Sequence, residues 1–193
     1  MRAGYLKWFV TVVGCACFSL GSWGPARSAE SFYLGAQVPY NVIQGDFDNT
    51  HAPEIDGALG LGVVLGYWLT QRIALEASWS VSKHHSAGTT IAVEEFSLNG
   101  RYALLSDRSV EPYALLGYGR FTLGDQSLTF GGRGMRFGLG LEWNPRSTVS
   151  QGVVLLRSTP SYDKIEKSDG PVILNGSLRG DMTSLIYSIR YHF

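Results

Sequence analysis

The stretch LIYSIRYHF, residues 185–193, alternates apolar and polar side chains up to the last residue. On one face of an extended chain it places only apolar or aromatic residues: Leu185, Tyr187, Ile189, Tyr191 and Phe193. The other face carries serine, arginine and histidine, with Ile186 as its apolar member. A period of two predicts a β-strand with one apolar face and one polar face. Because chain termini usually fray, we expect this strand to be held by a neighbour on each side.

The same two-residue period recurs through the rest of the chain. Clear alternation covers residues 59–69, 73–81, 95–104 and 135–144, and less regular alternation covers 32–40, 112–121 and 149–158. Together with the C-terminal stretch this predicts about eight strands of roughly 9–13 residues, the length with which a tilted strand crosses a bilayer. The facing of the three less regular strands stays open at this point.

The chemistry of the two faces favours a membrane barrel over a soluble sandwich. The polar faces carry serine, glycine and asparagine with a few arginines and glutamates, whereas the apolar faces carry large side chains along the whole strand. Only 17% of the 193 residues are charged, and 24 are glycine. A narrow packed interior surrounded by lipid explains both faces. The formal net charge of zero gives no electrostatic reason to expect a nucleic-acid partner.

Residues 1–29 have the layout of a secretory signal peptide, with a positive start, an apolar run over 8–20 and a region of small residues. The apolar run is shorter than the ~18 residues of a membrane-spanning helix. Cleavage is expected after Ala29 or one residue earlier, which leaves a single domain of residues 30–193. Both cysteines lie in this leader, and a lipoprotein-type cleavage at Cys15 is an alternative.

The expected connections alternate in length. Long or medium ones are expected at 41–57, 83–93, 122–134 and 159–183, and short ones at 70–72, 106–111 and 145–148. Outer-membrane barrels have long outer loops and short periplasmic turns, so the pattern predicts that both termini are periplasmic. Aromatic residues beside the short turns predict a girdle at that membrane boundary: Tyr67, Trp68, Tyr102, Tyr113, Trp143, Tyr191 and Phe193.

The stretch SLNGRYALLSDRSVEPYALLGYGR, residues 97–120, resembles one segment of OmpA-like and opacity-type outer-membrane barrels. In that segment a strand is followed by a short periplasmic turn and by a second strand that begins with Pro-Tyr. The stretches FGLGLEWNP (137–145) and YSIRYHF (187–193) are similar to the same family. The resemblance implies an all-β, eight-stranded, antiparallel, up-and-down transmembrane β-barrel in the outer membrane, without a cofactor. Larger members add a peptidoglycan-binding domain after the barrel, but this chain ends at the last strand, so wall anchoring is not expected.

The resemblance also implies partners. Outer-membrane lipid and lipopolysaccharide would surround the barrel, and the barrel-assembly machinery would insert it. In barrels of this kind the insertion machinery recognises the terminal aromatic strand, which makes Tyr191 and Phe193 the candidate assembly signal. A monomer is expected, and the partner of the surface loops is left open.

One group of residues suggests catalysis as an alternative. His84, His85 and Ser86 end one expected strand, while Glu94 and Glu95 begin the next. Histidine, serine and glutamate together can activate a serine nucleophile, as in small outer-membrane lipid A deacylases. In those enzymes a His-x-Ser element resembling HYSN lies on a late strand, but the corresponding stretch here, LLRSTPSYDK, has no histidine. We therefore expect no enzyme, and the histidine spacing predicts no metal site.

The expected inward faces also carry charged residues of both signs: Glu76, Glu95, Arg101, Arg120, Arg136, Glu142 and Arg190. An ion-pair network would fill an eight-stranded barrel, whose interior is just wide enough for side chains. A narrow pore is the alternative. The sequence thus predicts a non-enzymatic, structural outer-membrane barrel whose surface loops are available for adhesion or ligand contact.

Overall fold

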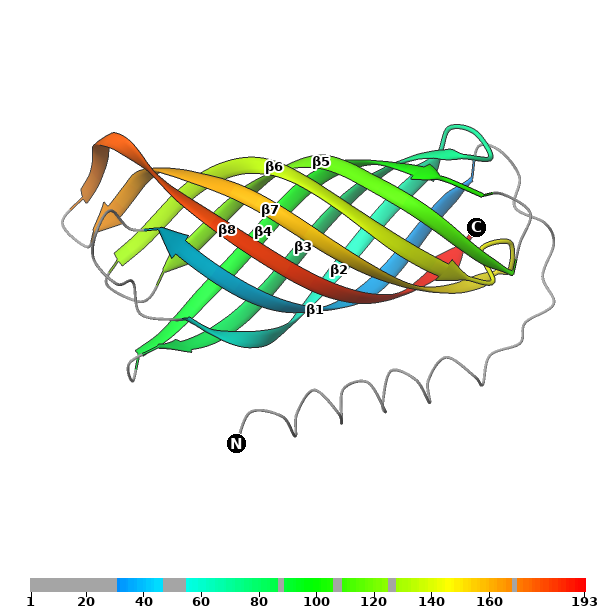
Figure 1. Cartoon of the computed structure of the whole chain (residues 1–193), viewed down its shortest axis with the longest axis horizontal. Coiled ribbons are helices and arrows are strands. Elements are labelled where there is room, and N and C mark those ends of the chain that lie inside the picture. The colour runs from blue at the N-terminus through cyan, green and yellow to red at the C-terminus, as the bar shows by residue number, and fades with distance from the viewer. Residues whose placement is uncertain (1–30, 47–54, 87–88, 106–108, 125–127, 168–169) are drawn as a thin grey trace.

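The computed structural model describes residues 31–46, 55–86, 89–105, 109–124, 128–167 and 170–193, so the predicted signal peptide lies outside the described residues. Eight strands form a closed antiparallel barrel (Figure 1). They are β1 (Phe32–Asp46), β2 (Ile55–Trp68), β3 (Ile73–Ser86), β4 (Thr89–Ala103), β5 (Val110–Gly124), β6 (Leu128–Trp143), β7 (Val149–Lys167) and β8 (Gly170–His192). No helix in this part of the chain is long and apolar enough to cross a membrane.

Each strand pairs with its neighbours in chain order, and β8 closes the ring against β1. A row of paired residues that starts at Phe32 and crosses all eight strands returns to β1 at Val42, well beyond its starting point. This stagger requires strands that are tilted against the barrel axis, and the tilt is visible in Figure 1.

The predicted lipid face is confirmed. Large apolar side chains stand outward along the strands, and several are more than half exposed: Leu59, Leu61, Leu65, Leu75, Leu98, Leu116, Leu139 and Leu155. Polar residues on the alternate positions of β3 and β4, such as Ser80 and Asn99, are buried inside. A barrel with an apolar exterior and a polar, filled interior is a transmembrane barrel turned toward lipid.

The two barrel ends differ in their connections. At the first, which we call the turn end, β2, β4 and β6 end and β3, β5 and β7 begin, and Phe193 lies there as well. At the second, the hairpin end, the strands continue as paired ribbons. The expected long connection at 159–183 is wrong, because β7 and β8 run on to Lys167 and from Gly170. Most of 83–93 and 122–134 is also paired strand, since backbone groups keep gaining partners beyond the apolar band.

The last strand is held on both sides, as expected. The backbone N–H of His192 donates to the carbonyl oxygen of Thr148 at 2.8 Å, and that of Phe193 donates to Phe32 at 3.0 Å. The aromatic girdle is only partly as predicted. Tyr102, Tyr191 and Phe193 are exposed on the outside. Trp68 and Tyr113 are instead fully buried inside the barrel, because each takes an inward position of its strand.

Candidate functional site

Five charged side chains meet inside the barrel near its turn end. Inward positions of five different strands supply them, and we call them the turn-end ion cluster: Glu76 (β3), Arg101 (β4), Glu111 (β5), Glu142 (β6) and Arg190 (β8). All five are buried. Strand alternation places them on the interior face, and the barrel register brings them to a similar depth.

Arg101 is the centre of the cluster. Its Nη2 forms an ion pair and a hydrogen bond with Oε2 of Glu142, and lies 3.9 Å from Oε1 of Glu111. Its Nη1 lies 3.5 Å from Oε1 of Glu76. Arg190 joins the same two carboxylates, with distances of 3.3 Å to Glu142 and 3.8 Å to Glu76. The two guanidinium groups therefore share acceptors and link β3, β4, β6 and β8 across the interior.

Aromatic rings enclose these charges. The hydroxyl of Tyr33 donates to Oε1 of Glu76 at 2.5 Å. The guanidinium of Arg101 lies 3.7 Å from the ring centre of Tyr113 and 5.3 Å from that of Trp68. Cation–π contacts of this kind strengthen when water is excluded. The inward turn of Tyr113 and Trp68, which sequence reasoning placed in the girdle, is thus part of how the cluster is packed.

A second ion pair lies farther from the turn end. Arg136 on β6 pairs with Glu95 on β4 and donates to Oγ of Ser97, and Ser97 hydrogen-bonds Ser78 at 2.7 Å. The structure thus places six of the seven expected interior charges inside. The exception is Arg120, which is exposed on the outer face of β5.

Sequence reasoning missed Glu111 and misplaced Arg120, and both errors come from β5. This strand carries apolar residues on both faces, so its facing could not be read from alternation alone. The structure puts Glu111, Tyr113 and Leu115 inside and Leu116 and Tyr118 outside. Because side chains alternate between the two faces of a strand, Arg120 then faces outward, as Tyr118 does.

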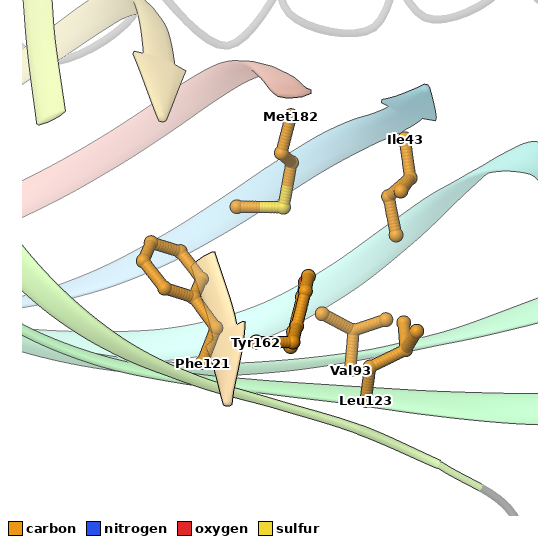
Figure 2. Close-up of a cluster of buried hydrophobic side chains, with 6 residues drawn as sticks. All are labelled: Ile43, Val93, Phe121, Leu123, Tyr162 and Met182. Carbon is orange, nitrogen blue, oxygen red and sulfur yellow. The ribbon is translucent and has the colours of Figure 1, made fainter. Parts of the chain in front are cut away.

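The interior near the hairpin end has the opposite chemistry. Six side chains from five strands pack there as the hairpin-end apolar cluster, shown in Figure 2: Ile43, Val93, Phe121, Leu123, Tyr162 and Met182. Ile91 and Phe130 pack against it. Sequence reasoning did not find this cluster, because it left the facing of residues 112–121 open and placed Val93 and Leu123 in connections. The structure extends β4 back to Thr89 and β5 on to Gly124, and strand alternation then turns Val93, Phe121 and Leu123 inward.

Both interior clusters are closed to solvent. A water-filled lumen would expose the side chains that line it, but Arg101, Glu142 and Phe121 are each at most 1% exposed. Charge pairing dominates the described interior at the turn end, where an apolar cluster that includes Tyr113 and Leu115 packs beside it. Apolar packing dominates at the hairpin end, next to the Arg136–Glu95 pair. The packed interior can therefore support a rigid barrel wall and exclude water.

The candidate catalytic histidines point in opposite directions. His84 is buried inside, where its Nε2 lies 3.0 Å from Oγ of Ser82. His85 is exposed on the outer face, where its Nδ1 lies 3.2 Å from Oγ1 of Thr90. The side chain of Ser86 is not among those that the structure describes.

The candidate glutamates are engaged elsewhere. Glu94 faces outward and accepts a hydrogen bond from the indole nitrogen of Trp79 at 2.7 Å, while Glu95 pairs with Arg136 inside. Along the strands, His84 is separated from Glu95 on the inner face by about 13 Å, at ~3.3 Å per residue. The same distance separates His85 from Glu94 on the outer face. The structure does not bring these residues into a hydrogen-bonded set. No group of histidine, cysteine or carboxylate side chains in the described ranges could hold a metal ion.

The candidate assembly residues lie together on the outer surface at the turn end. The rings of Tyr191 and Phe193 meet edge to face with centres 5.1 Å apart, and Phe32 and Tyr67 form a neighbouring pair at 4.6 Å. Phe193 is 73% exposed. Its ring is thus accessible at the boundary of the apolar band.

Comparison with known proteins agrees with this architecture. The family model described as the outer membrane protein beta-barrel domain matches residues 13–169. The chain belongs to this family. No curated protein sequence matches it.

Solved structures of small outer-membrane barrels share the fold of this family member. Neisserial surface protein A has 15% sequence identity and a TM-score of 0.62, over 84% of this chain and 97% of that one. OprG from Pseudomonas aeruginosa has 16% identity and a TM-score of 0.56, over 88% and 98%. The attachment invasion locus protein of Yersinia pestis, solved with the heparin analogue sucrose octasulfate, has 13% identity and a TM-score of 0.55, over 86% and 100%.

Proposed function

We propose that this protein is a closed, non-enzymatic barrel of the outer membrane that anchors a set of surface hairpins. The observation that carries the proposal is the burial of the turn-end ion cluster. Arg101 and Glu142 lie inside the barrel near its turn end with almost no exposure. To pass through the barrel, ions and water would have to separate these buried arginines from their carboxylate partners. Separation of a buried ion pair is energetically costly because it leaves a buried charge without its partner.

The turn end would face the periplasm and the hairpin end the cell exterior. Short connections at one end and extended ribbons at the other support this orientation, because outer-membrane barrels carry short turns on the periplasmic side. Both ends of the barrel domain, Phe32 and Phe193, lie at the turn end. The exposed pair Tyr191 and Phe193 would then be presented to the barrel-assembly machinery from the periplasm.

Contacts with other molecules would take place at the hairpin end. Related folds support this, since one belongs to a neisserial surface protein and another to an attachment protein that was solved with a heparin analogue. We propose that the hairpins β3–β4 and β7–β8 carry an adhesive or ligand-contacting surface. The barrel itself would act as a monomer, because its ring is closed without a second chain.

Ion conductance in planar bilayers tests the closed lumen. We expect no current steps from the refolded wild-type protein, and steps from a double variant, Arg101→Ser with Glu142→Ser, that removes the central pair. The matched control is Arg157→Ser with Asp181→Ser, which removes an ion pair on the outer face whose side chains are 54% and 42% exposed. Regular steps from the wild type would instead identify a narrow pore.

A further inference from the structure

An apolar groove of about 430 Å³ lies on the outer face of β2, β3 and β4. Two small outward residues, Ala77 and Gly100, form its floor. A side chain at Gly100 would enter open space, since the nearest atom to its Cβ would be the carbonyl oxygen of Leu116 at 3.7 Å. Larger outward side chains form the walls: Phe32, Leu65, Tyr67, Leu75 and Leu98. Small side chains between large ones leave a channel that fits an extended hydrocarbon chain.

The groove continues into a second recess at the turn end. Three successive pairs of the β3–β4 ladder connect the two: Ala77–Leu98, Leu75–Gly100 and Ile73–Tyr102. The last of these pairs lines the second recess, of about 530 Å³, together with residues 69–72. The strand from Leu98 to Tyr102 is about 13 Å long at ~3.3 Å per residue and rises about 10 Å at a tilt of ~40°. The groove therefore lies in the half of the ~25 Å apolar band that is next to the turn end.

The backbone around the second recess is held in place by hydrogen bonds. Oγ1 of Thr70 accepts the backbone N–H groups of Arg72 at 3.2 Å and of Ile73 at 3.0 Å. The carbonyl oxygen of Arg72 accepts the N–H of Ala103 on β4 at 2.8 Å. The turn between β2 and β3 is thus tied to β4, and Arg72 leaves it from a fixed backbone position.

The side chains of this recess supply hydrogen-bond donors. Arg72 is exposed, and no carboxylate in the described ranges forms an ion pair with it. Gln71 and the exposed Tyr102 line the same recess, and no acidic residue does. Arginine binds phosphate through paired, charge-assisted hydrogen bonds, and tyrosine rings favour the headgroup level of a membrane. The recess therefore has the chemistry of a phosphodiester site at the membrane boundary.

We propose that the recess and the groove together bind one anionic glycerophospholipid, with its phosphodiester on Arg72 and an acyl chain over Gly100. An anionic headgroup fits better than an ethanolamine headgroup, because the recess has no carboxylate to pair with an ammonium group. The site rests on the proposed function in one respect. With the turn end in the periplasm, the lipid belongs to the periplasmic leaflet.

Lipid binding to the refolded protein in mixed micelles, followed by native mass spectrometry, tests the site. The probes are phosphatidylglycerol, phosphatidylethanolamine and diacylglycerol with the same acyl chains. We expect the wild type to bind phosphatidylglycerol about tenfold or more tightly than diacylglycerol, as for charge-assisted contacts. Phosphatidylethanolamine should bind more weakly than phosphatidylglycerol.

Two variants address the two parts of the site separately. Arg72→Gln should lose the preference for phosphatidylglycerol over diacylglycerol, whereas Gly100→Leu fills the groove and should weaken the binding of all three lipids. The matched controls are Arg146→Gln, at an exposed arginine of the connection between β6 and β7, and Ala114→Leu, in the apolar groove on β5, β6 and β7. Both controls should bind as the wild type does.

Urea unfolding in neutral detergent shows whether the variants remain folded. Gly100→Leu should unfold at the same or a higher urea concentration than the wild type, because a glycine inside a strand weakens it. Added phosphatidylglycerol should raise the midpoint of the wild type and not that of Arg72→Gln.

Three results would overturn the proposal. The first is an unchanged lipid preference in Arg72→Gln, and the second is an equal loss in either control. The third is a protein dimer that disappears in Gly100→Leu, which would assign the groove to a second copy of this chain. Binding in micelles does not depend on the orientation of the barrel in the cell or on a closed lumen. Surface proteolysis and conductance test those two parts of the proposed function separately.

Discussion

The two ends of the barrel interior are packed mainly with opposite chemistry. Near the turn end, guanidinium groups and carboxylates pack among aromatic rings, with Arg101 held between Glu142 and the ring of Tyr113. Near the hairpin end, apolar side chains such as Phe121 and Met182 pack against each other (Figure 2). Apolar packing needs only volume, whereas the ion pairs need particular partners on particular strands. The comparison suggests that the charged half fixes the register and the apolar half adds stability with less geometric demand.

The largest effect is expected from Glu142→Gln. The neutral amide removes one of the two carboxylates that Arg101 and Arg190 share in a buried site and leaves only Glu76. Loss of one partner of a buried ion pair costs about 3–5 kcal/mol. Urea unfolding of the refolded protein, followed by tryptophan fluorescence, measures this loss.

The control for that variant is Asp181→Asn, which breaks the exposed pair with Arg157. Exposed ion pairs contribute about 0–1 kcal/mol, so its unfolding midpoint should hardly move. If Glu142→Gln were as mild as this control, the turn-end cluster would not hold the strands together, and the contrast between the two halves would fail.

Met182→Ala examines the apolar half. Removal of a buried methionine side chain leaves a cavity among Phe121, Tyr162 and Ile43 and should cost about 3 kcal/mol. Met182→Leu conserves volume and should cost less than about 1.5 kcal/mol. The apolar cluster thus tolerates a substitution that conserves volume. The ion cluster does not, because no isosteric replacement of Glu142 retains the charge. Equal losses for the leucine and alanine variants would show that the hairpin-end cluster is as demanding as the ion cluster.

Strand alternation predicted most of the fold, but it could not predict how the interior is divided. The eight strands, their order and the lipid face follow from the period of two, as on β2 and β6. The inward turn of Trp68 follows from the same rule once Tyr67 faces lipid, because adjacent side chains point to opposite faces. Arg120 required the structure, since a polar residue suggests the interior although an outward arginine costs little near the membrane boundary. The ion partners depend on the register between distant strands, which one sequence does not display.

The outer surface has a gradient of its own, which an arginine scan at different depths would reveal. Leu98 is 60% exposed on β4 in the middle of the apolar band, and Leu98→Arg should cost at least about 2 kcal/mol, as for a cation near the bilayer midplane. Thr159 also faces outward, but it lies opposite Met135 and close to the hairpin end. Thr159→Arg should cost at most about 1 kcal/mol. Refolding into lipid vesicles at several urea concentrations compares the two, and equal values would mean that the depth assignment is wrong.

The smallest effect on stability, and the largest in the cell, is expected from deletion of Phe193. The deletion removes one backbone hydrogen bond to Phe32 and one ring contact with Tyr191. Contacts of these two kinds are worth about 1 kcal/mol each, so the shortened protein should still refold in detergent.

In cells, however, the exposed ring would no longer be available to the assembly machinery, and we expect the shortened protein to accumulate in the periplasm or be degraded. Phe193→Tyr keeps an aromatic ring at the same position and should insert normally. Cell fractionation with proteolysis of surface hairpins measures insertion for both. Normal surface levels of the shortened protein would mean that Phe193 serves only to close the barrel, as β8 does from Arg179 to His192.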